Sequence, residues 1–249
     1  MIWLAIAFLV TALLYASVGF GGGSTYSALL ALSDVDYRIL PLLSLACNIV
    51  VVVGGTVRFA RAKITPWKGA LVLTGLAAPA AFLGGLTPID REPFLLILGA
   101  SLLLTGATLL IPNRSGGVGE AKTSAYASKL MPFAAMPLGY LAGLVGIGGG
   151  IFLAPLLHLT RWNNARAIAA TASLFILVNS LFGLAGQILK GGPDRFAAAV
   201  TFGLPLLLAV ALGGWIGSLL ATRILPVNWI RWATAMLTIW VGARLLFGL

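Results

Sequence analysis

Acidic side chains are scarce in this chain, and none falls in an apolar stretch. The 249 residues include only six Asp and Glu, and charged residues make up 9% of the sequence, against about a quarter in soluble proteins. The six acids are Asp34, Asp36, Asp90, Glu92, Glu120 and Asp194, and we expect all of them to lie in loops or turns. The sequence therefore argues against a buried carboxylate proton relay of the kind that many membrane pumps use.

Cysteine and histidine are nearly absent, with one residue of each. The single Cys47 cannot form an intrachain disulfide or a multi-cysteine metal cluster, and we expect it to be a small packing residue. No Gly-x-x-x-x-Gly-Lys-Ser/Thr motif for nucleotide phosphates occurs. We therefore expect no cofactor and no metal site. A membrane-embedded enzyme and an assembly subunit without transport activity are the alternatives, although no paired carboxylates or nucleophile with a neighbouring base support an enzyme.

Apolar residues dominate the chain, with 60% hydrophobic residues and a mean hydropathy of +1.04. Apolar runs near the ~20 residues that cross a bilayer recur throughout, so the sequence predicts an all-α integral membrane protein. The first run lacks a basic start and a small-residue cleavage site, and we expect it to be a retained helix. The net charge of +10 comes from basic residues between the runs, which the positive-inside rule explains better than nucleic-acid binding.

The runs predict about eight transmembrane helices in two homologous four-helix halves. Residues 1–111 form the first repeat, 112–129 a polar linker and 130–249 the second repeat. Short matches keep the same order in both halves, such as Ser44-Leu45 with Ser173-Leu174, which indicates an internal duplication. Four crossings per half would give parallel repeats. Re-entrant hairpins would change that count, so parallel and inverted repeats both stay open.

Two glycine-rich stretches interrupt the first apolar run of each half. They are Gly19-Phe20-Gly21-Gly22-Gly23 and Gly146-Ile147-Gly148-Gly149-Gly150. A glycine costs roughly 1 kcal/mol in a helix relative to alanine and permits positive φ, so we expect the helix to break at both places. Inside a bilayer, protein or a water-filled cavity must satisfy the freed backbone groups. The pair therefore indicates a central site served by both halves.

We expect backbone N–H groups at these breaks to hold a small anion, with polar side chains that either join the site or bond neighbouring helices. The candidate binding residues are Gly19, Gly21, Gly22, Gly23, Ser24, Thr25, Ser44, Asn48, Gly146, Gly148, Gly149, Gly150, Ile151, Thr171, Ser173 and Asn179. Arg38 and Arg166, at matching starts of the second helix, either form an electropositive mouth or reach the lipid interface. Gly139, Gly143, Gly213 and Gly217 are expected only to allow close helix packing.

Three motifs together resemble the sulfite exporter TauE/SafE family of bacterial membrane proteins. They are the paired glycine breaks, Arg166-Ala167 before Thr171-Ala172-Ser173, and Arg58-Phe59-Ala60-Arg61 after the second helix. The resemblance covers nearly the whole chain and implies a four-plus-four-helix duplication that moves sulfite, sulfonates and related sulfur-containing or organic anions. Leu43-Ser44-Leu45 departs from the more usual Gly-Thr-Ser or Gly-Thr-Asn pattern, so Ser44 and Asn48 are both eligible as the polar ligand of the first half.

Basic residues predict the orientation. Arg58, Arg61, Lys63 and Lys68 follow the second run with no acid among them, which places this segment in the cytoplasm. With eight crossings both termini would lie there too, in a multi-pass protein of the cytoplasmic (inner) membrane. We expect a small anion and the lipid bilayer as partners, with a homo-oligomer left open and no nucleic acid. An inside-negative potential favours export, by facilitated diffusion or by coupling to an ion.

Overall fold

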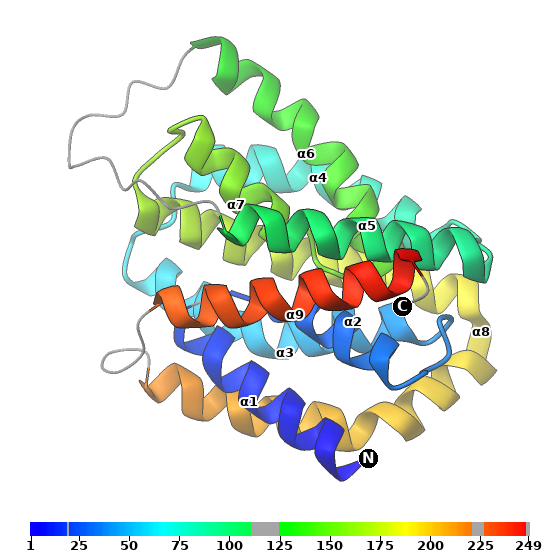
Figure 1. Ribbon diagram of the computed structural model, residues 1–249. Coiled ribbons are helices and arrows are strands. Elements are labelled where there is room, and N and C mark those ends of the chain that lie inside the picture. Colours follow the sequence, from blue (N-terminus) through cyan, green and yellow to red (C-terminus); the bar gives the residue numbers. More distant parts are fainter. Residues whose placement is uncertain (19, 111–124, 221–226, 248–249) are drawn as a thin grey trace.

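All the regular structure within the described residues is α-helical, which confirms the predicted fold class. The computed structural model describes residues 1–18, 20–110, 125–220 and 227–247. The helices are α1 (Ile2–Val18), α2 (Gly23–Leu32), α3 (Leu40–Arg61), α4 (Trp67–Leu86), α5 (Arg91–Leu110), α6 (Ala125–Val145), α7 (Gly150–Leu159), α8 (Ala165–Leu220) and α9 (Val227–Phe247). Figure 1 shows that α8 reverses direction, and it does so at Gly192, where φ is 69° and ψ is 178°. Glycine alone adopts this conformation readily.

Several of these helices are suited to a bilayer. Among the described residues, α3, α4, α5 and the double helix α8 are long and apolar enough to cross a membrane, with mean hydropathies of 1.7 to 2.2. Leu71, Leu104 and Leu212 lie exposed on their outer surfaces. In water such faces would be unfavourable, whereas lipid solvates them at no cost. These helices therefore support a multi-pass membrane protein.

The short helix α2 folds back along α1. It has ten residues, or about 15 Å, which is half of the ~30 Å hydrocarbon core. Gly22 lies against Thr11, and one turn further along α2 the ring of Tyr26 packs on Phe8 with centroids 4.7 Å apart. Residue numbers rise along α2 as they fall along α1, so the two helices are antiparallel. The first glycine stretch thus forms a re-entrant hairpin, one of the two arrangements that the sequence left open.

The helix α7 repeats this arrangement against α6. It also has ten residues. Gly149, just before α7, lies against Ala142, and further along α7 Leu157 shares an apolar cluster with Ala135. The chain therefore enters the bundle twice without crossing it.

The first helix of each hairpin packs in parallel against a helix from the other half of the chain. Gly139 meets Ala77, Gly143 meets Ala81, Gly213 meets Leu9 and Gly217 meets Leu13, in each case at the backbone carbonyl of the partner. In each pair of helices the residue numbers of the contacting residues increase in the same direction. The helix α6 therefore runs parallel to α4, and α1 runs parallel to the second part of α8. Any larger residue would overlap the facing carbonyl, which is the close packing expected of these glycines.

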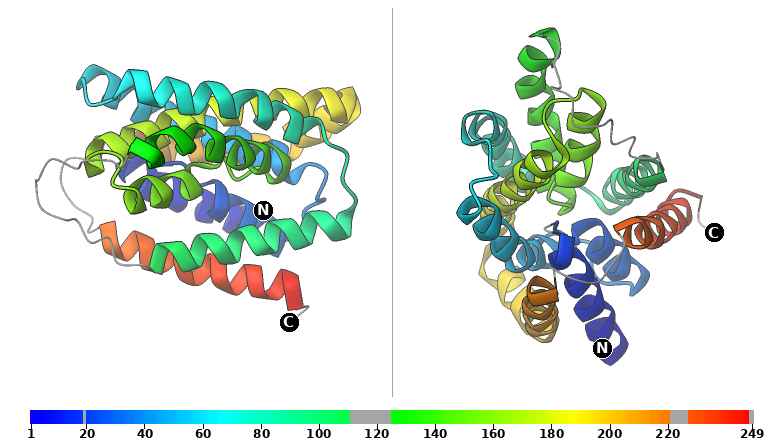
Figure 2. Two further views of the ribbon diagram at one scale, coloured as in Figure 1. Left: turned by 90° about the horizontal axis from the view of Figure 1, so that it is seen from above. Right: turned by 90° about the vertical axis from the view of Figure 1, so that its left-hand side faces the viewer.

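The helix directions define two ends of the bundle. At the termini end, α1 begins, α8 reverses and α9 finishes; at the linker end lie residues 62–66 and 160–164 (Figure 2). Contacts identify the linker end: Arg58, near the end of α3, donates to the carbonyl of Ala16 near the end of α1, and Gly69 of α4 lies against Trp162. The start of α1 and the end of α9 therefore lie at the opposite end from Arg58–Lys68, unlike the arrangement with eight crossings, because each hairpin returns the chain to the end where it entered. On which side of the membrane the termini lie stays a prediction.

Replacing Gly143 by valine tests the helix contacts. The new side chain would overlap the Ala81 carbonyl, so we expect a loss of about 1–3 kcal/mol or failure to fold, measured by thermal unfolding in detergent. The matched control is Gly54→Ala, because no atom lies within 4 Å of its Cβ position, and it should gain about 0.5–1 kcal/mol of helix propensity. Equal unfolding temperatures for Gly143→Val and the native protein would contradict the packing described here.

Candidate functional site

The two unwound stretches meet near the centre of the bundle. Gly23, the first residue of α2, lies against the carbonyl of Ile147 in the second stretch. In that stretch Gly146, Gly148 and Gly149 have φ values of 82°, 84° and 74°, which non-glycine residues rarely adopt. The helices α2 and α7 thus begin close together, and the positive ends of both helix dipoles point toward one place.

Asn48 and Ile176 lie between the two stretches. Asn48 is buried, and its Nδ2 donates to the carbonyl of Ile147 at 3.3 Å, which joins α3 to the second stretch. Both Asn48 and Ile176 lie next to Gly21 and next to Gly148. Their separation in sequence matches that of Arg38 and Arg166. Corresponding positions of the two halves therefore face each other across the centre, one polar and one apolar.

Three buried polar atoms around the stretches have no hydrogen-bond partner among the described residues. They are the Oγ of Ser24 in the first turn of α2, the Oδ1 of Asn48 and the Oγ of Ser180, which lies next to Gly148. All three side chains are essentially inaccessible to solvent. An unpartnered buried polar atom costs about 1–3 kcal/mol, and a bound polar ligand would supply the missing partners.

Two other predicted residues hold the first hairpin in place. Ser44 donates to the carbonyl of Gly23 at 3.0 Å, so α3 fixes the start of α2. The hydroxyl of Thr25 lies 3.0 Å from the hydroxyl of Tyr15 on α1. Both side chains therefore position the unwound backbone and already have partners. Gly19 falls outside the described residues.

The predicted polar residues of α8 have different surroundings. Ser173 pairs with Thr56 of α3 at 2.9 Å, and Thr171 donates to the carbonyl of Ala167 in its own helix. Asn179 is buried, with both amide atoms unpartnered among the described residues. Ser180 was missed by the sequence reading, although its position beside Asn179 was a usable signal.

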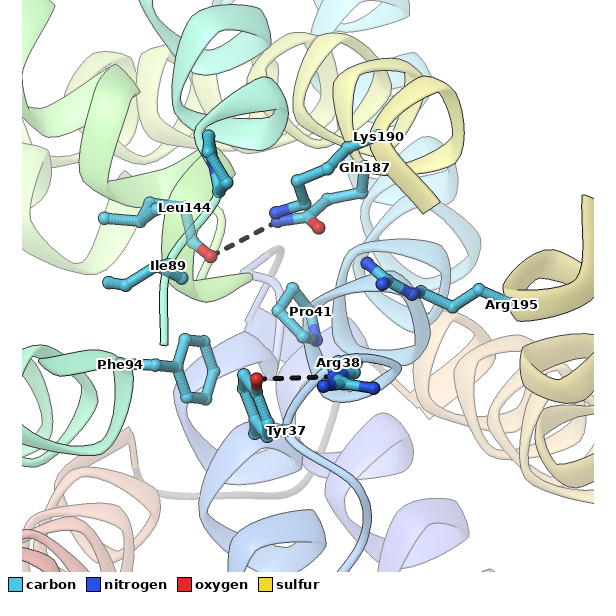
Figure 3. Close-up of a pocket in the computed structure, with 10 residues that line it drawn as sticks. Tyr37, Arg38, Pro41, Ile89, Phe94, Leu144, Gln187, Lys190 and Arg195 are labelled. Carbon is cyan, nitrogen blue, oxygen red and sulfur yellow. Dashed lines mark hydrogen bonds between the residues drawn. The ribbon is translucent and has the colours of Figure 1, made fainter. Parts of the chain in front are cut away.

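A cavity of about 350 Å³ opens at the termini end, and we call it the vestibule. Figure 3 shows Arg38, Lys190 and Arg195 on one side and Ile89, Phe94 and Leu144 on the other. Its volume lies at the lower end of the range for ligand pockets. Among the described residues, no Asp or Glu lines it. The vestibule thus offers one cationic wall and one apolar wall to an organic or inorganic anion.

The vestibule extends to the second glycine stretch. Its lining residue Pro41 packs directly against Gly146. Another lining residue, Gln187, donates from Nε2 to the carbonyls of Gly143 and Leu144, at 2.9 and 3.2 Å, where α6 ends. Pro41 therefore lies between the vestibule and Gly146 of the second glycine stretch.

Lys190 is a vestibule residue whose surroundings lower its pKa. It is half-buried beside the turn at Gly192, between the two apolar runs of α8, and its Nζ donates to the carbonyl of Thr87 at 3.2 Å. Loss of hydration, with a smaller effect from the charge of Arg195, lowers the pKa of Lys190 to about 8. An anion nearby would favour its charged form.

Arg38 and Arg166 lie at opposite ends of the bundle. Arg38 precedes α3 at the termini end and lines the vestibule, whereas Arg166 is exposed in the first turn of α8 at the linker end. They therefore do not form one mouth together. Lys190 and Arg195, which lie on either side of a Gly-Gly-Pro turn in the sequence, line the vestibule together with Arg38, whereas Arg166 does not.

Comparison with known proteins places this geometry in a family. The family described as Sulfite exporter TauE/SafE matches residues 4–245. The chain belongs to the TauE/SafE family. The chain is 32% identical over 249 residues to the "Probable membrane transporter protein y4hK" of Sinorhizobium fredii, covering 99% of this chain and 98% of that protein. It is 22% identical over 232 residues to the "Probable membrane transporter protein YunE" of Bacillus subtilis, covering 83% and 82%. No solved structure matches it significantly.

Membership of the TauE/SafE family confirms the resemblance drawn from the motifs. The family and both relatives are named as transporters, so the expectation of a membrane transporter in place of an enzyme is confirmed. The breaks, the polar atoms around them and the vestibule are therefore candidate parts of a transport pathway in this TauE/SafE protein.

Substituting Lys190 by methionine tests the charge of the vestibule. In the native protein Lys190 is charged below its pKa of about 8 and neutral above it, so uptake of methanesulfonate, which stays anionic, should fall as pH rises through 8. Lys190→Met should lower uptake at pH 7 by about fivefold, equivalent to about 1 kcal/mol for a half-buried charge, and remove this pH step. The assay is flux into liposomes, with the exposed Lys68→Met at the linker end as control. A pH step that persists in Lys190→Met would contradict this assignment.

Proposed function

We propose that this TauE/SafE protein is a secondary transporter or facilitator that exports small sulfur-containing or organic anions, such as sulfite or sulfonates. The observation that supports this most is the meeting of two half-length helices by their N-termini, in a described part of the chain whose fully buried polar side chains are all neutral. Helix N-termini bind anions through free N–H groups and the helix dipole. A site without a fixed cation can bind an anion and still release it.

The donors for the anion come from both hairpins. The first amides of a helix have no intrahelical acceptor, which applies to Ser24 and its neighbours in α2. In α7 the amides of Gly150 and Phe152 already donate to the carbonyls of Gly148 and Gly149, which leaves the amide of Ile151. The hydroxyls of Ser24 and Ser180 would complete a shell of neutral donors.

The helix directions support two inverted repeats with the proposed boundaries 1–111, 112–129 and 130–249. α1 runs from the termini end to the linker end, and α6 runs the other way. Each repeat has a hairpin followed by three longer helices. Three net crossings per repeat invert the second repeat relative to the first, and inverted repeats allow a central site to face either side in turn.

The distribution of basic residues supports a cytoplasmic linker end. Among the described residues, eight Lys and Arg belong to segments at that end: Arg58, Arg61, Lys63, Lys68, Lys129, Arg161, Arg166 and Arg231. The other five belong to the termini end: Arg38, Arg91, Lys190, Arg195 and Arg244. By the positive-inside rule the vestibule then faces outward, and an inside-negative potential drives anions toward it.

Reconstitution into liposomes tests the activity. We expect flux of at least one of sulfite, thiosulfate and sulfoacetate above that of empty liposomes, and faster flux out of the cytoplasmic side when that side is negative. Chloride serves as the comparison for selectivity. Absence of flux for these anions and for related sulfonates, with a folded protein, would overturn the proposal.

Replacing Ser180 by alanine separates a binding role from a packing role. Because its hydroxyl has no partner among the residues that the structure describes, the change should leave stability unchanged or raise it, whereas transport should fall about tenfold if the hydroxyl holds the anion. Thr105→Val is the matched control, since it removes another buried unpartnered hydroxyl, on α5, where Gly106 packs against α9. Thermal unfolding and flux are measured on both variants. Equal flux in Ser180→Ala and the native protein would remove Ser180 from the site.

A further inference from the structure

Arg58 joins three helices at the linker end. Its half-buried guanidinium donates to the carbonyl of Ala16 in the last turn of α1 and to the carbonyl of Ser218 in the last turn of α8, both at 3.2 Å. Arg58 itself lies in the last turn of α3. α1 and α3 come from the first half and this part of α8 from the second, so one side chain connects the two halves.

The chemistry of helix ends explains why arginine suits this position. The last carbonyls of a helix lack intrahelical donors and carry the negative end of its dipole. A guanidinium presents several N–H groups in a fixed plane, so it can serve two helix ends at once. Below this contact, Gly213 and Gly217 already bring the same two helices together along their length.

Gln187 occupies the corresponding position at the termini end. It follows Arg58 by 129 residues, the same spacing as that of Ser44 and Ser173. Its amide donates to the carbonyls of Gly143 and Leu144 at the end of α6, as Arg58 does at the end of α1. At the termini end, a different side chain makes the hydrogen bond to the other half of the chain: Lys190 donates to the carbonyl of Thr87 at the end of α4.

The two ends therefore differ in how they are held. At the termini end, two side chains share the contacts that Arg58 makes alone, and both Gln187 and Lys190 line the vestibule (Figure 3). At the linker end, a single charged group bonds both helix ends directly. The vestibule lies at the termini end, where its lining residue Pro41 packs against Gly146, and Arg58 lies at the opposite end of the bundle.

We infer that Arg58 is the positioning residue that holds the linker end closed, and that rupture of its two hydrogen bonds to α1 and α8 opens that end to the glycine stretches. Opening requires the ends of α1 and α8 to separate, and Arg58 is the described side chain that donates to both. The inference concerns gating and is independent of which solute is carried.

Thiol labelling from each side of the membrane tests this inference. The background protein carries Cys47→Ala and Val52→Cys, because Val52 lies between Asn48 and Arg58 along α3 and next to Gly21. A membrane-impermeant methanethiosulfonate reagent is applied to either face of sealed vesicles. The exposed Lys63→Cys, made in a separate protein, marks the linker side.

With Arg58→Gln, labelling of Val52→Cys from the linker side should accelerate at least about tenfold, since each lost hydrogen bond to a charged group can supply that factor. Arg58→Lys, which keeps the charge but lacks the planar fork, should give a smaller increase. The exposed Arg61→Gln in the same helical turn should change nothing.

Two results would overturn the inference. One is an unchanged labelling rate from the linker side in Arg58→Gln; the other is an equal increase from both sides, which would indicate general loosening of the bundle. If Arg58→Gln does not fold, the Arg58→Lys protein provides the same comparison. No anion is needed for this measurement, so a failure of the proposed transport activity and a failure of the gating role are separately visible.

Discussion

Unwound backbone at the centre of a membrane protein must find its hydrogen-bond partners inside the protein, and this constraint organises the whole bundle. Ser44 and Asn48 satisfy part of it, by donating to the carbonyls of Gly23 and Ile147. At the two helix starts some amide donors remain, such as that of Ile151, since Gly150 and Phe152 already donate to the carbonyls of Gly148 and Gly149. The site is therefore a consequence of how the backbone is broken, and the side chains around it are neutral.

The hairpins are enclosed by helix pairs that glycine holds in close contact. α6 with α4, and α1 with the end of α8, each join one half of the chain to the other through glycines set against carbonyls. Such contacts resist shear, because a carbonyl fits where a side chain is missing. At the ends, by contrast, single polar side chains such as Arg58 and Gln187 bridge the helices.

The sequence predicted some of this arrangement well. Four glycines in five positions are enough to indicate a broken helix, and the glycine pairs of α6 and α8 were correctly read as packing sites. The direction of the chain after each break could not be derived, because glycine permits a bend without specifying it. That one unknown decides at which end of the bundle α1 begins, and it places Arg38 and Arg166 at opposite ends. No signal in the sequence indicated Ile176, because only the fold brings it beside Gly148.

The central claim is that the anion binds where α2 and α7 begin. Selenite has the shape and charge of sulfite, and its selenium scatters X-rays anomalously. Crystals grown with selenite should show an anomalous peak within hydrogen-bond distance of the amides of Ser24 and Ile151 and of the hydroxyl of Ser180. A protein that transports selenite but shows its peak only in the vestibule or at the lipid surface would contradict the account.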